Sequence, residues 1–576
     1  MHLEACRSLA AAATLALLSA CGGGGAGGGG PVTPVFSVSA NQLTFTATGP
    51  GAATPPGQSV SAKVTGTLAG TLYVLVNVTG TAVTNVSQFA ISGSTGTATV
   101  SVNSPAILGT GTYSSVITVR ACANDQSCAT GELQGSPQVI TVSYTVAGRA
   151  IADIVLPHVV VAGLTDQVLI RGSGLTGTTA VAFGATPAQS FSVVGDSLIK
   201  ATYPATLSPG ALAVHLTGST KPFSGSVAVV GAEAYPATTL SYPQTPARVI
   251  ATVFDAERQV LYVAASFASN QVVSNSNNQL WRYTYSGGGW SQPTVIGIPY
   301  LHDVALPGDG SKLQVLTDTA VLEYDAANPT TPTHTATASF ASAEVPGATY
   351  LSRFAFGNDG TALVGTGWWG SQAATDAYLY DGVTGTYTDL GGAYQFMYSV
   401  DGSGTPLVAS ADGSVVLAAP AFAGSSGSVV YDPITGLYRP LGDYIVQATD
   451  QPPAVDNSGN HVIFTQYNQS PVLNANSSYN AFGYLPGTTA GSTTQVVLVN
   501  PQGTRAYVLQ SDATLHSIDL TAAPAGSQLS YPEIGAGVAQ AIPSTTSPTL
   551  RTAVSADGKT LFIAGDAGVA VIPAPQ

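Results

Sequence analysis

Residues 35–148 consist of short runs in which apolar and polar residues alternate. Such runs occur at 42–46, 59–64, 71–77, 97–102, 113–119 and 139–146, and Gly, Pro or Asn residues separate them. Alternation with a period of two places successive side chains on opposite faces of a strand, and closely spaced turn residues favour hairpins. No helical spacing competes with this pattern. The segment is therefore predicted to form an antiparallel β-sandwich.

Residues 149–232 form a second, shorter sandwich candidate. Gly172, Gly174 and Gly177 match the spacing G-x-G-x-x-G, which in dinucleotide-binding folds precedes a helix whose N-terminus faces the pyrophosphate. Here the residues that follow, 178–183, are strand-like. Asp196 stands near the distance expected of a ribose-binding carboxylate. Because the helix is missing, the spacing does not predict nucleotide binding.

From about residue 233 onward, a turn followed by a strand recurs about every fifty residues, which is typical of a radial repeat fold. The aligned units start at Arg258, Gly310, Gly360, Gly413, Gly459, Gly503 and Gly558. Asp, Asn or Gln beside glycine is typical of hairpins that need a positive φ. A second hairpin often ends in an Asp-bearing turn, as at 379–385 and 430–436. Two hairpins per unit predict four-stranded blades, and the units together predict a seven-bladed β-propeller.

The phrase Leu-Ser-Tyr-Pro occurs twice, at 240–243 and at 529–532. The last repeat unit ends at 569–572 after three strand-like segments, so it lacks a fourth strand of its own. The segment 239–243 can supply that strand, because its twin finishes the preceding blade. We therefore predict a propeller closed by pairing between its first and last segments, which leaves no free sheet edge.

These patterns together predict an all-β chain with two β-sandwich domains followed by the propeller. The predicted boundaries are 1–20 for an export signal, 21–34 for a Gly-rich tether, 35–148 and 149–232 for the sandwiches, and 233–576 for the propeller.

The first thirty residues carry the features of an export signal and are excluded from fold reasoning. The apolar stretch 9–18 is too short to span a bilayer. Leu18-Ser19-Ala20-Cys21 resembles the lipobox of bacterial lipoproteins, and the glycine run that follows is similar to their flexible tethers. The resemblance implies that Cys21 becomes the lipidated first residue and that the protein is anchored at the outer membrane, periplasmic or surface-exposed. The alternative is an ordinary secretory peptide with a chance cysteine.

Cysteine usage agrees with export. Cys6 and Cys21 lie in the N-terminal segment, so only Cys122 and Cys128 remain in the folded part. Five turn-forming residues separate the pair, and an oxidising compartment favours one disulfide across a hairpin loop. A metal site would need more ligands, and no His or second Cys pair lies nearby in the sequence.

Three further resemblances cover the folded part. Residues 35–148, with the Leu-Thr-Phe strand at 43–45 and the Cys pair before the last strand, resemble Ig-like and BACON-like modules of bacterial surface proteins. Residues 149–232, with Gly172, Gly174 and the strand at 181–184, resemble an IPT/TIG domain. The repeats at 239–574 resemble YVTN-like and kelch-like propellers. The resemblances imply spacer or binding modules that carry a propeller.

Composition narrows the partners. Charged residues make up 8% of the chain, the formal net charge is −14, and there are 16 Lys and Arg residues in all. Affinity for nucleic acid comes mainly from clustered Lys and Arg, so this chain is not predicted to bind it. The predicted membrane contact is through the lipid anchor only, and the oligomeric state is left open.

No local motif predicts catalysis. The sequence has no H-E-x-x-H, G-x-S-x-G or C-x-x-C, and its seven His residues do not occur at ligand spacing. We therefore expect no cofactor, no metal and no catalytic residue, although distant residues can converge in a propeller channel. The propeller is predicted to bind a protein or glycan. A propeller-type lyase or hydrolase with its active site in the central channel is the alternative, and an architectural envelope component is a third possibility.

Aromatic and polar residues of the first blades are the binding candidates. Exposed aromatic rings stack on sugars or anchor peptides, whereas buried ones fill the space between blades. The candidates are Trp281, Trp290, Trp368 and Trp369, with His302, its neighbour Asp303, and Arg353 at the channel rim.

Overall fold

The computed structural model describes residues 11–15, 33–49, 52, 54–68, 70–92, 94–108, 111–147, 152–267, 275–338, 349–368, 377–389, 407–418, 429–432, 437–440, 453–465, 470–473, 483–485, 493–524, 530–543 and 550–575. These residues form strands and turns, with one short helix, α1 (Pro105–Leu108). In this part of the chain no helix has the length and apolar character needed to cross a bilayer. The contacts divide the chain into two units, one of residues 1–149 with 435–437 and one of the remaining residues.

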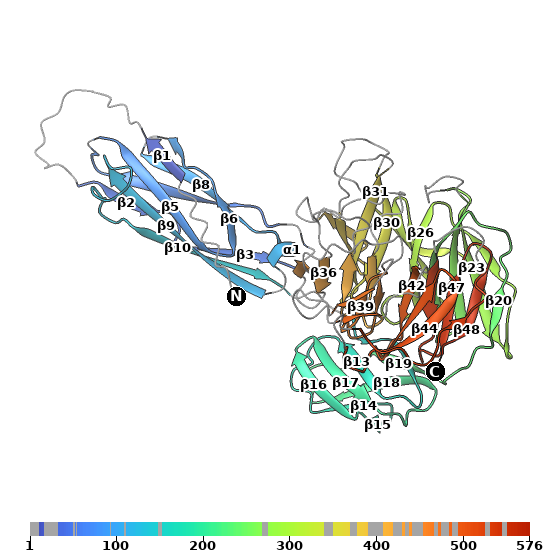
Figure 1. Ribbon diagram of the computed structural model, residues 1–576. Helices are drawn as coiled ribbons and strands as arrows, with labels where there is room; N and C mark the ends of the chain where they lie inside the picture. Colours follow the sequence, from blue (N-terminus) through green and yellow to red (C-terminus); the bar gives the residue numbers. More distant parts are fainter. Residues whose placement is uncertain are drawn as a thin grey trace, which may run out of the picture. The chain divides into compact units, whose positions relative to one another are not determined.

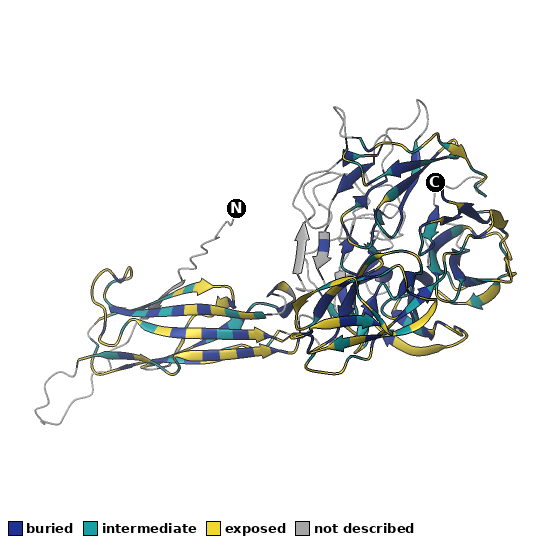
Figure 2. Ribbon diagram, turned by 90° about the horizontal axis from the view of Figure 1, so that it is seen from below, coloured by how far each residue is buried: buried dark blue, intermediate teal, exposed yellow. Residues whose placement is uncertain are grey.

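The N-terminal unit consists of two sheets that share one core. The first sheet has the order β1-β5-β9-β10-β3, with bounds β1 (Ala11–Leu15), β3 (Gln42–Ala47), β5 (Leu72–Gly80), β9 (Gly111–Ala123) and β10 (Gln138–Val146). The second has the order β2-β4-β8-β6, with β7 also paired to β8; their bounds are β2 (Val35–Val38), β4 (Gln58–Thr65), β6 (Val83–Val86), β7 (Ala90–Ser92) and β8 (Thr95–Val102). Buried and exposed positions alternate along the long strands, as the sequence pattern requires (Figure 2). The buried sets of both sheets form one hydrophobic cluster.

Strand β1 lies within the predicted export signal. It pairs antiparallel with β5, with Ala11 opposite Val76 and Leu15 opposite Leu72. The sequence argument excludes this segment from the fold, whereas the structure adds it to a sheet edge. The physical reason is that an apolar segment can satisfy the open backbone groups of β5. Cleavage of the signal would leave β5 as the edge strand.

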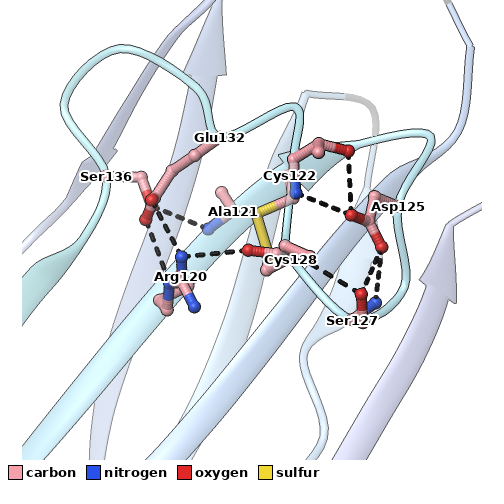
Figure 3. A network of polar contacts seen from close by, with 10 residues as sticks. Arg120, Ala121, Cys122, Asp125, Ser127, Cys128, Glu132 and Ser136 are labelled. Atoms are coloured by element: carbon pink, nitrogen blue, oxygen red, sulfur yellow. Dashed lines mark hydrogen bonds and ion pairs between the residues drawn. A yellow bond between two sulfur atoms is a disulfide. The ribbon is translucent and has the colours of Figure 1, made fainter.

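A disulfide joins Cys122 and Cys128 across the loop that follows β9, with their Cα atoms 5.4 Å apart. Two polar clusters hold this loop (Figure 3). The Asp125 carboxylate accepts hydrogen bonds from the backbone N–H groups of Ser127 at 2.9 Å and Thr130 at 2.7 Å. The hydrogen bond from the Ser127 hydroxyl, at 2.6 Å, and these backbone hydrogen bonds lower the pKa of Asp125. On the other side, the Arg120 guanidinium donates from Nε and Nη2 to the two carboxylate oxygens of Glu132.

The second unit begins with two further sheets around a separate core. One sheet has the order β11-β13-β17-β16, with bounds β11 (Ile154–Leu156), β13 (Asp166–Arg171), β16 (Ser190–Gly195) and β17 (Leu198–Tyr203). The other has the order β12-β19-β18-β14-β15, with bounds β12 (Val159–Val161), β14 (Ala180–Phe183), β15 (Thr186–Pro187), β18 (Gly210–Thr217) and β19 (Ser226–Val230). Buried Val, Ile and Phe side chains from both sheets make up the core.

The rest of this unit is a series of small antiparallel sheets (Figure 1). The first five sheets comprise β21 (Arg248–Asp255), β22 (Val260–Ser266), β23 (Gln279–Ser286), β24 (Gly289–Trp290) and β25 (Thr294–Gly297); β26 (Leu301–Ala305), β27 (Lys312–Thr317), β28 (Ala320–Asp325) and β29 (Pro332–Thr337); β30 (Thr349–Phe356), β31 (Thr361–Trp368), β32 (Ala377–Asp381) and β33 (Thr386–Asp389); β34 (Leu407–Ala409), β35 (Val416–Ala418), β36 (Val429–Asp432) and β37 (Leu437–Pro440); and β38 (Ala454–Val455), β39 (Val462–Ile463), β40 (Pro471–Leu473) and β41 (Gly483–Tyr484). Two more comprise β42 (Thr494–Val499), β43 (Arg505–Gln510), β44 (Thr514–Asp519) and β45 (Val538–Ala539), and β20 (Thr238–Leu240) with β46 (Arg551–Val554), β47 (Thr560–Ala564) and β48 (Val569–Pro573).

The first strands of successive sheets contact one another in a closed circle. Strand β21 contacts β26, and the contacts continue through β30, β34, β38 and β42 to β46, which contacts β21 again. Neighbouring sheets share buried cores, as where Tyr262 of β22 packs in one cluster with Leu301 of β26 and Val315 of β27. This arrangement is a β-propeller.

The predicted turn glycines join the first and second strands of the sheets. Their φ angles lie between +63° and +79° at Gly310, Gly360, Gly413, Gly459, Gly503 and Gly558. Each Gly N–H donates to the carbonyl of the residue three positions earlier, as from Gly413 to Ser410 at 2.8 Å. The turn chemistry predicted for the repeat is therefore confirmed. In the first sheet Gln259 adopts the left-handed conformation instead, with φ of 53°.

The ends of the propeller meet in one sheet. Strand β20 pairs antiparallel with β48, with Thr238 opposite Val571 and Leu240 opposite Val569 (Figure 1). The paired segment starts one residue before the predicted 239–243 and ends at Leu240. The Tyr242 hydroxyl, just beyond, donates to the carbonyl oxygens of Gly565 at 2.7 Å and Gly568 at 2.9 Å. The first and last segments are therefore held together by a backbone ladder and one side chain.

Candidate functional site

A cavity of about 370 Å³ lies at the centre of the ring. Strands β21, β26, β30, β34 and β46 line it, together with the turns that follow some of them. Leu156 and His158, from the second sandwich, also line it. We call this space the hub cavity. Its lining is mixed, with apolar strand residues beside Asp303, Arg353 and Arg551.

A β-bulge recurs in the strands around the hub cavity. The pairing register shifts between Val249 and Ala251 in β21, between Leu301 and Asp303 in β26, and between Leu351 and Arg353 in β30. A bulge leaves one residue outside the hydrogen-bond ladder and redirects the backbone there. The residues between each pair are therefore Ile250, His302 and Ser352, and the backbone carbonyls of Ile250 and His302 accept hydrogen bonds from side chains.

Two buried arginines bind these carbonyls. Arg353 donates from Nη1 to the oxygens of Ile250 at 3.2 Å and His302 at 3.1 Å. Arg551 donates from Nε to the same Ile250 oxygen at 2.7 Å. Because the two guanidinium groups share one acceptor, they lie side by side, although Arg353 comes from the third sheet along the chain and Arg551 from the last. Both residues are buried, with exposed fractions of 8% and 5%.

Asp303 places a carboxylate next to Arg353. Its Oδ1 lies 3.9 Å from Arg353 Nη1, and its oxygens accept hydrogen bonds from the backbone N–H groups of Val304 at 2.9 Å and Phe354 at 3.3 Å. Burial raises the pKa of Asp303, and the charge of Arg353 and the backbone donors oppose that shift only in part. The group therefore holds two cations and one carboxyl that ionises less readily than usual.

His302 is a predicted rim residue whose side chain does not line the hub cavity. Its Nε2 contacts the Asp318 carboxylate, and its ring stacks on Tyr350 with centroids 5.0 Å apart. Burial lowers the pKa of His302, although Asp318 acts in the opposite direction. Its contribution to the site is the backbone carbonyl that binds Arg353. Arg353, predicted at the rim, lies in the cavity lining.

The two tryptophans whose side chains the structure describes differ in burial. Trp281 has no exposed surface, and its ring packs on Tyr242 with centroids 4.6 Å apart. Trp290 packs on Tyr285 at 5.2 Å and on Phe562 of the last sheet at 5.7 Å. Both side chains pack in the seam between the first and last sheets. Trp281 is fully buried, whereas Trp290 is half-buried and lines a separate cavity beside β20. Trp368 ends β31, but its side chain, like Trp369 and Cys21, lies outside the described residues.

The sequence analysis missed three residues that line the hub cavity: Arg551, His158 and Thr252 of β21. One signal could have found Arg551: Asp303, Arg353 and Arg551 each stand seven residues before the turn glycine of their unit. Aligning the strand before each turn, rather than the strand after it, places the three charges at one position of the repeat. His158 comes from another domain, and the repeat pattern holds no information about it.

The lining offers binding groups rather than an evident nucleophile. Ser410 lines the cavity, but its hydroxyl donates to Asp412 Oδ1 at 2.7 Å. Within the described residues, no group of three or more His, Cys, Asp or Glu side chains is placed to hold a metal ion.

The glycine loop of the second sandwich is occupied by its own chain. Asp196 accepts hydrogen bonds from the N–H groups of Gly174 at 3.1 Å and Thr176 at 3.4 Å. Strand β14 follows the loop, where a dinucleotide fold would have a helix. The loop amides that would face a pyrophosphate are thus bound to a carboxylate within the domain.

A closed ring of antiparallel sheets around a polar hub defines the C-terminal part as a β-propeller. No family model matches the chain, and no curated protein matches its sequence. A chain in the crystal structure of the mitotic checkpoint complex is similar in structure, with 16% identity and a TM-score of 0.39, over 60% of this chain and 96% of that one. Hsv2 of Kluyvelomyces marxianus has 8% identity and a TM-score of 0.33, over 56% and 89% of the two chains. Neither likeness is close enough to assign a function.

Proposed function

We propose that this protein is an exported, lipid-anchored binding protein that holds a ligand in its propeller. The lipobox-like Leu18-Ser19-Ala20-Cys21 and the glycine run after it support the anchor. A lipid on Cys21 would hold the chain at the outer membrane without spanning it. The sandwiches, as Ig-like and IPT/TIG-like modules, serve as spacers, and the sheets of the ring are the blades of a seven-bladed propeller.

The observation that carries the binding function is the hub cavity. Cavities that hold small ligands are mostly apolar with a few fixed polar groups, and their volumes begin at about 300 Å³. The hub cavity, at about 370 Å³, has this character, with Arg353, Arg551 and Asp303 held by backbone contacts. A cavity of this size favours a glycan unit or a short peptide segment over a folded protein surface.

A lyase or hydrolase acting at the hub is the second candidate. The supporting observation is that burial raises the pKa of Asp303, whose carboxylate lies 3.9 Å from Arg353 Nη1. Perturbed carboxyl groups beside cations are suited to general acid or base chemistry. The binding function ranks first because the lining shows no paired nucleophile and base among the described residues.

The anchor is tested by expressing the full chain in a Gram-negative host and labelling it with a fatty acid analogue. We expect label in the membrane fraction for the native chain and none for Cys21→Ser. Cys6→Ser is the matched control, because Cys6 lies in the same segment outside the lipobox-like sequence. Equal labelling of Cys21→Ser and the native chain would exclude the anchor.

The binding function is tested with residues 22–576, the lipid-free mature chain, on glycan and peptide arrays. We expect binding to one class of glycan or peptide. The array ligands that score are then incubated with the protein and analysed for cleavage. Turnover of a candidate substrate without stable binding on either array would favour the enzyme instead.

A further inference from the structure

The residues that line the hub cavity carry an excess of positive charge. Within the described lining, the ionisable side chains are Asp303, Arg353, Arg551 and His158. Arginine stays charged at all relevant pH values, so the two guanidinium groups face one carboxyl group. Buried charges are costly unless they are paired. This excess does not come from a generally basic chain, because the net charge is −14.

The guanidinium of Arg353 keeps donors available to the cavity. Its Nη1 makes both hydrogen bonds to backbone carbonyls, while Nε and Nη2 make none within the described part of the chain. The planar arrangement of these N–H groups matches the two oxygens of a carboxylate. Arg551 adds a second positive charge beside it, since both side chains bind the Ile250 oxygen.

Two further polar atoms of the lining are buried without a partner. They are the hydroxyl of Thr252, on β21, and Nε2 of His158, and neither has a hydrogen-bond partner among the described residues. Buried polar atoms are almost always satisfied in folded proteins, so each exception calls for a bound water or ligand. Both atoms have almost no accessible surface, and His158 Nε2 faces the Gly310 turn, so only the Thr252 hydroxyl would reach a ligand bound at the arginines, by rotation of its side chain.

We propose that the hub cavity binds a carboxylate carried by a small polar molecule, with Arg353 and Arg551 as its charged partners and Thr252 as a hydrogen-bond partner. This inference rests on the binding function proposed above and names its ligand chemistry. The cavity volume of about 370 Å³ limits the ligand to about one or two sugar rings or amino acid residues. An acidic sugar and a peptide carboxylate share this chemistry.

Isothermal titration calorimetry on residues 22–576 tests the proposal. The probes are D-galacturonate and its dimer for acidic sugars, glycyl-aspartate and succinate for other carboxylates, D-galactose as the neutral analogue, and sodium sulfate as a simple anion. We expect one carboxylate class to bind and D-galactose to bind at least tenfold more weakly, because the charge pairing is lost. Binding of sulfate or of D-galactose as tight as that of the best carboxylate would overturn the proposal.

Variants separate this proposal from the general binding function. Arg353→Lys should weaken the bound carboxylate about tenfold or more, because an ammonium group cannot replace the bidentate fork. The matched control is Arg505→Lys, since Arg505 Nη1 also donates to a backbone carbonyl, that of Pro575 at 3.1 Å, outside the hub cavity. This control should bind like the native chain.

Thr252→Val removes the unpartnered hydroxyl with little change in shape. It should weaken the carboxylate probe about fivefold without lowering the melting temperature, because the hydroxyl has no partner to lose in the ligand-free protein. A variant that melts earlier and binds normally would contradict the role of Thr252. If an array ligand binds Arg353→Lys and Thr252→Val as tightly as it binds the native chain, the binding function stands and the carboxylate site is wrong. If neither arrays nor probes show binding, both are wrong.

Discussion

Removing the Tyr242 hydroxyl should weaken the closure of the propeller. This hydroxyl donates to two carbonyl oxygens, those of Gly565 and Gly568, in the turn between β47 and β48. Burial raises the pKa of Tyr242, so the hydroxyl stays protonated and remains a donor throughout the physiological range. Tyr242→Phe keeps the ring and its packing against Trp281 while deleting the hydrogen bond that the two carbonyls share.

The expected cost follows from one lost hydrogen bond, because the single hydroxyl proton is shared between the two acceptors. A net hydrogen bond contributes about 1 kcal/mol, and a buried acceptor left without its donor adds a desolvation penalty of similar size. The Gly568 oxygen keeps a second donor, the Gly565 N–H at 3.0 Å, so the variant does not leave this acceptor without a hydrogen bond. We therefore expect a destabilisation of about 1–3 kcal/mol for Tyr242→Phe. For a domain of this size, this corresponds to a fall of about 2–5 °C in the melting temperature of the propeller.

The second copy of the phrase provides the matched control. Tyr531 occupies the same place in Leu-Ser-Tyr-Pro and is also buried, but its hydroxyl makes no hydrogen bond within the described residues. Tyr531→Phe should therefore leave the melting temperature unchanged. Hydrogen exchange should show faster opening of β48 in Tyr242→Phe and normal protection in Tyr531→Phe. Equal melting and equal exchange in the two variants would refute the assignment of Tyr242 as a closing contact.

Three further predictions concern the disulfide, a buried carboxyl and the turn glycines. Replacing Cys122 and Cys128 by Ser should destabilise the N-terminal sandwich by about 2 kcal/mol, because the closed loop is short, and calorimetry should show the propeller transition unmoved. Burial raises the pKa of Asp412 to about 6, so the folded state holds its proton more tightly than the unfolded state and loses stability as pH rises from about 4 to 6. The native chain should lose at most about 3 kcal/mol of stability in this way, and Asp412→Asn should remove this pH dependence in melting curves recorded between pH 4 and 7. Gly360→Ala should lower the free energy of unfolding by about 1 kcal/mol, because of the positive φ at this position. Gly413→Ala should lower it more, because a Cβ there would lie 2.6 Å from the Asn358 backbone nitrogen. Equal melting temperatures of the two variants would contradict this.

The sequence predicted the features of this fold that are local. Alternating residues and glycine turns identify strands and hairpins one at a time, so the all-β class and the repeat could be inferred without knowing which strands meet. The pairing of β20 with β48 could be inferred because the last unit lacks a fourth strand of its own. The supporting argument from the second copy of the phrase was wrong, because β45, and not 529–532, is the fourth strand of the preceding sheet. The full burial of Trp281 could not be inferred, because a strand pattern does not say which face of a blade meets the next blade.

The hub cavity depends on β-bulges, which the pattern of a single strand does not reveal. Its charges are held by carbonyls that bulges release, and a bulge is visible only in the pairing of two strands. The position after each bulge holds Ala251, Asp303 or Arg353 in consecutive sheets, while the backbone there keeps the same form. Because the backbone, and not the side chain, makes the acceptors, the side chain at this position can change without altering the ring. The charge of the hub cavity is therefore set by a few positions of the repeat. In this propeller Asp303, Arg353 and Arg551 occupy them, and the two arginines against one aspartate give the cavity an excess of positive charge.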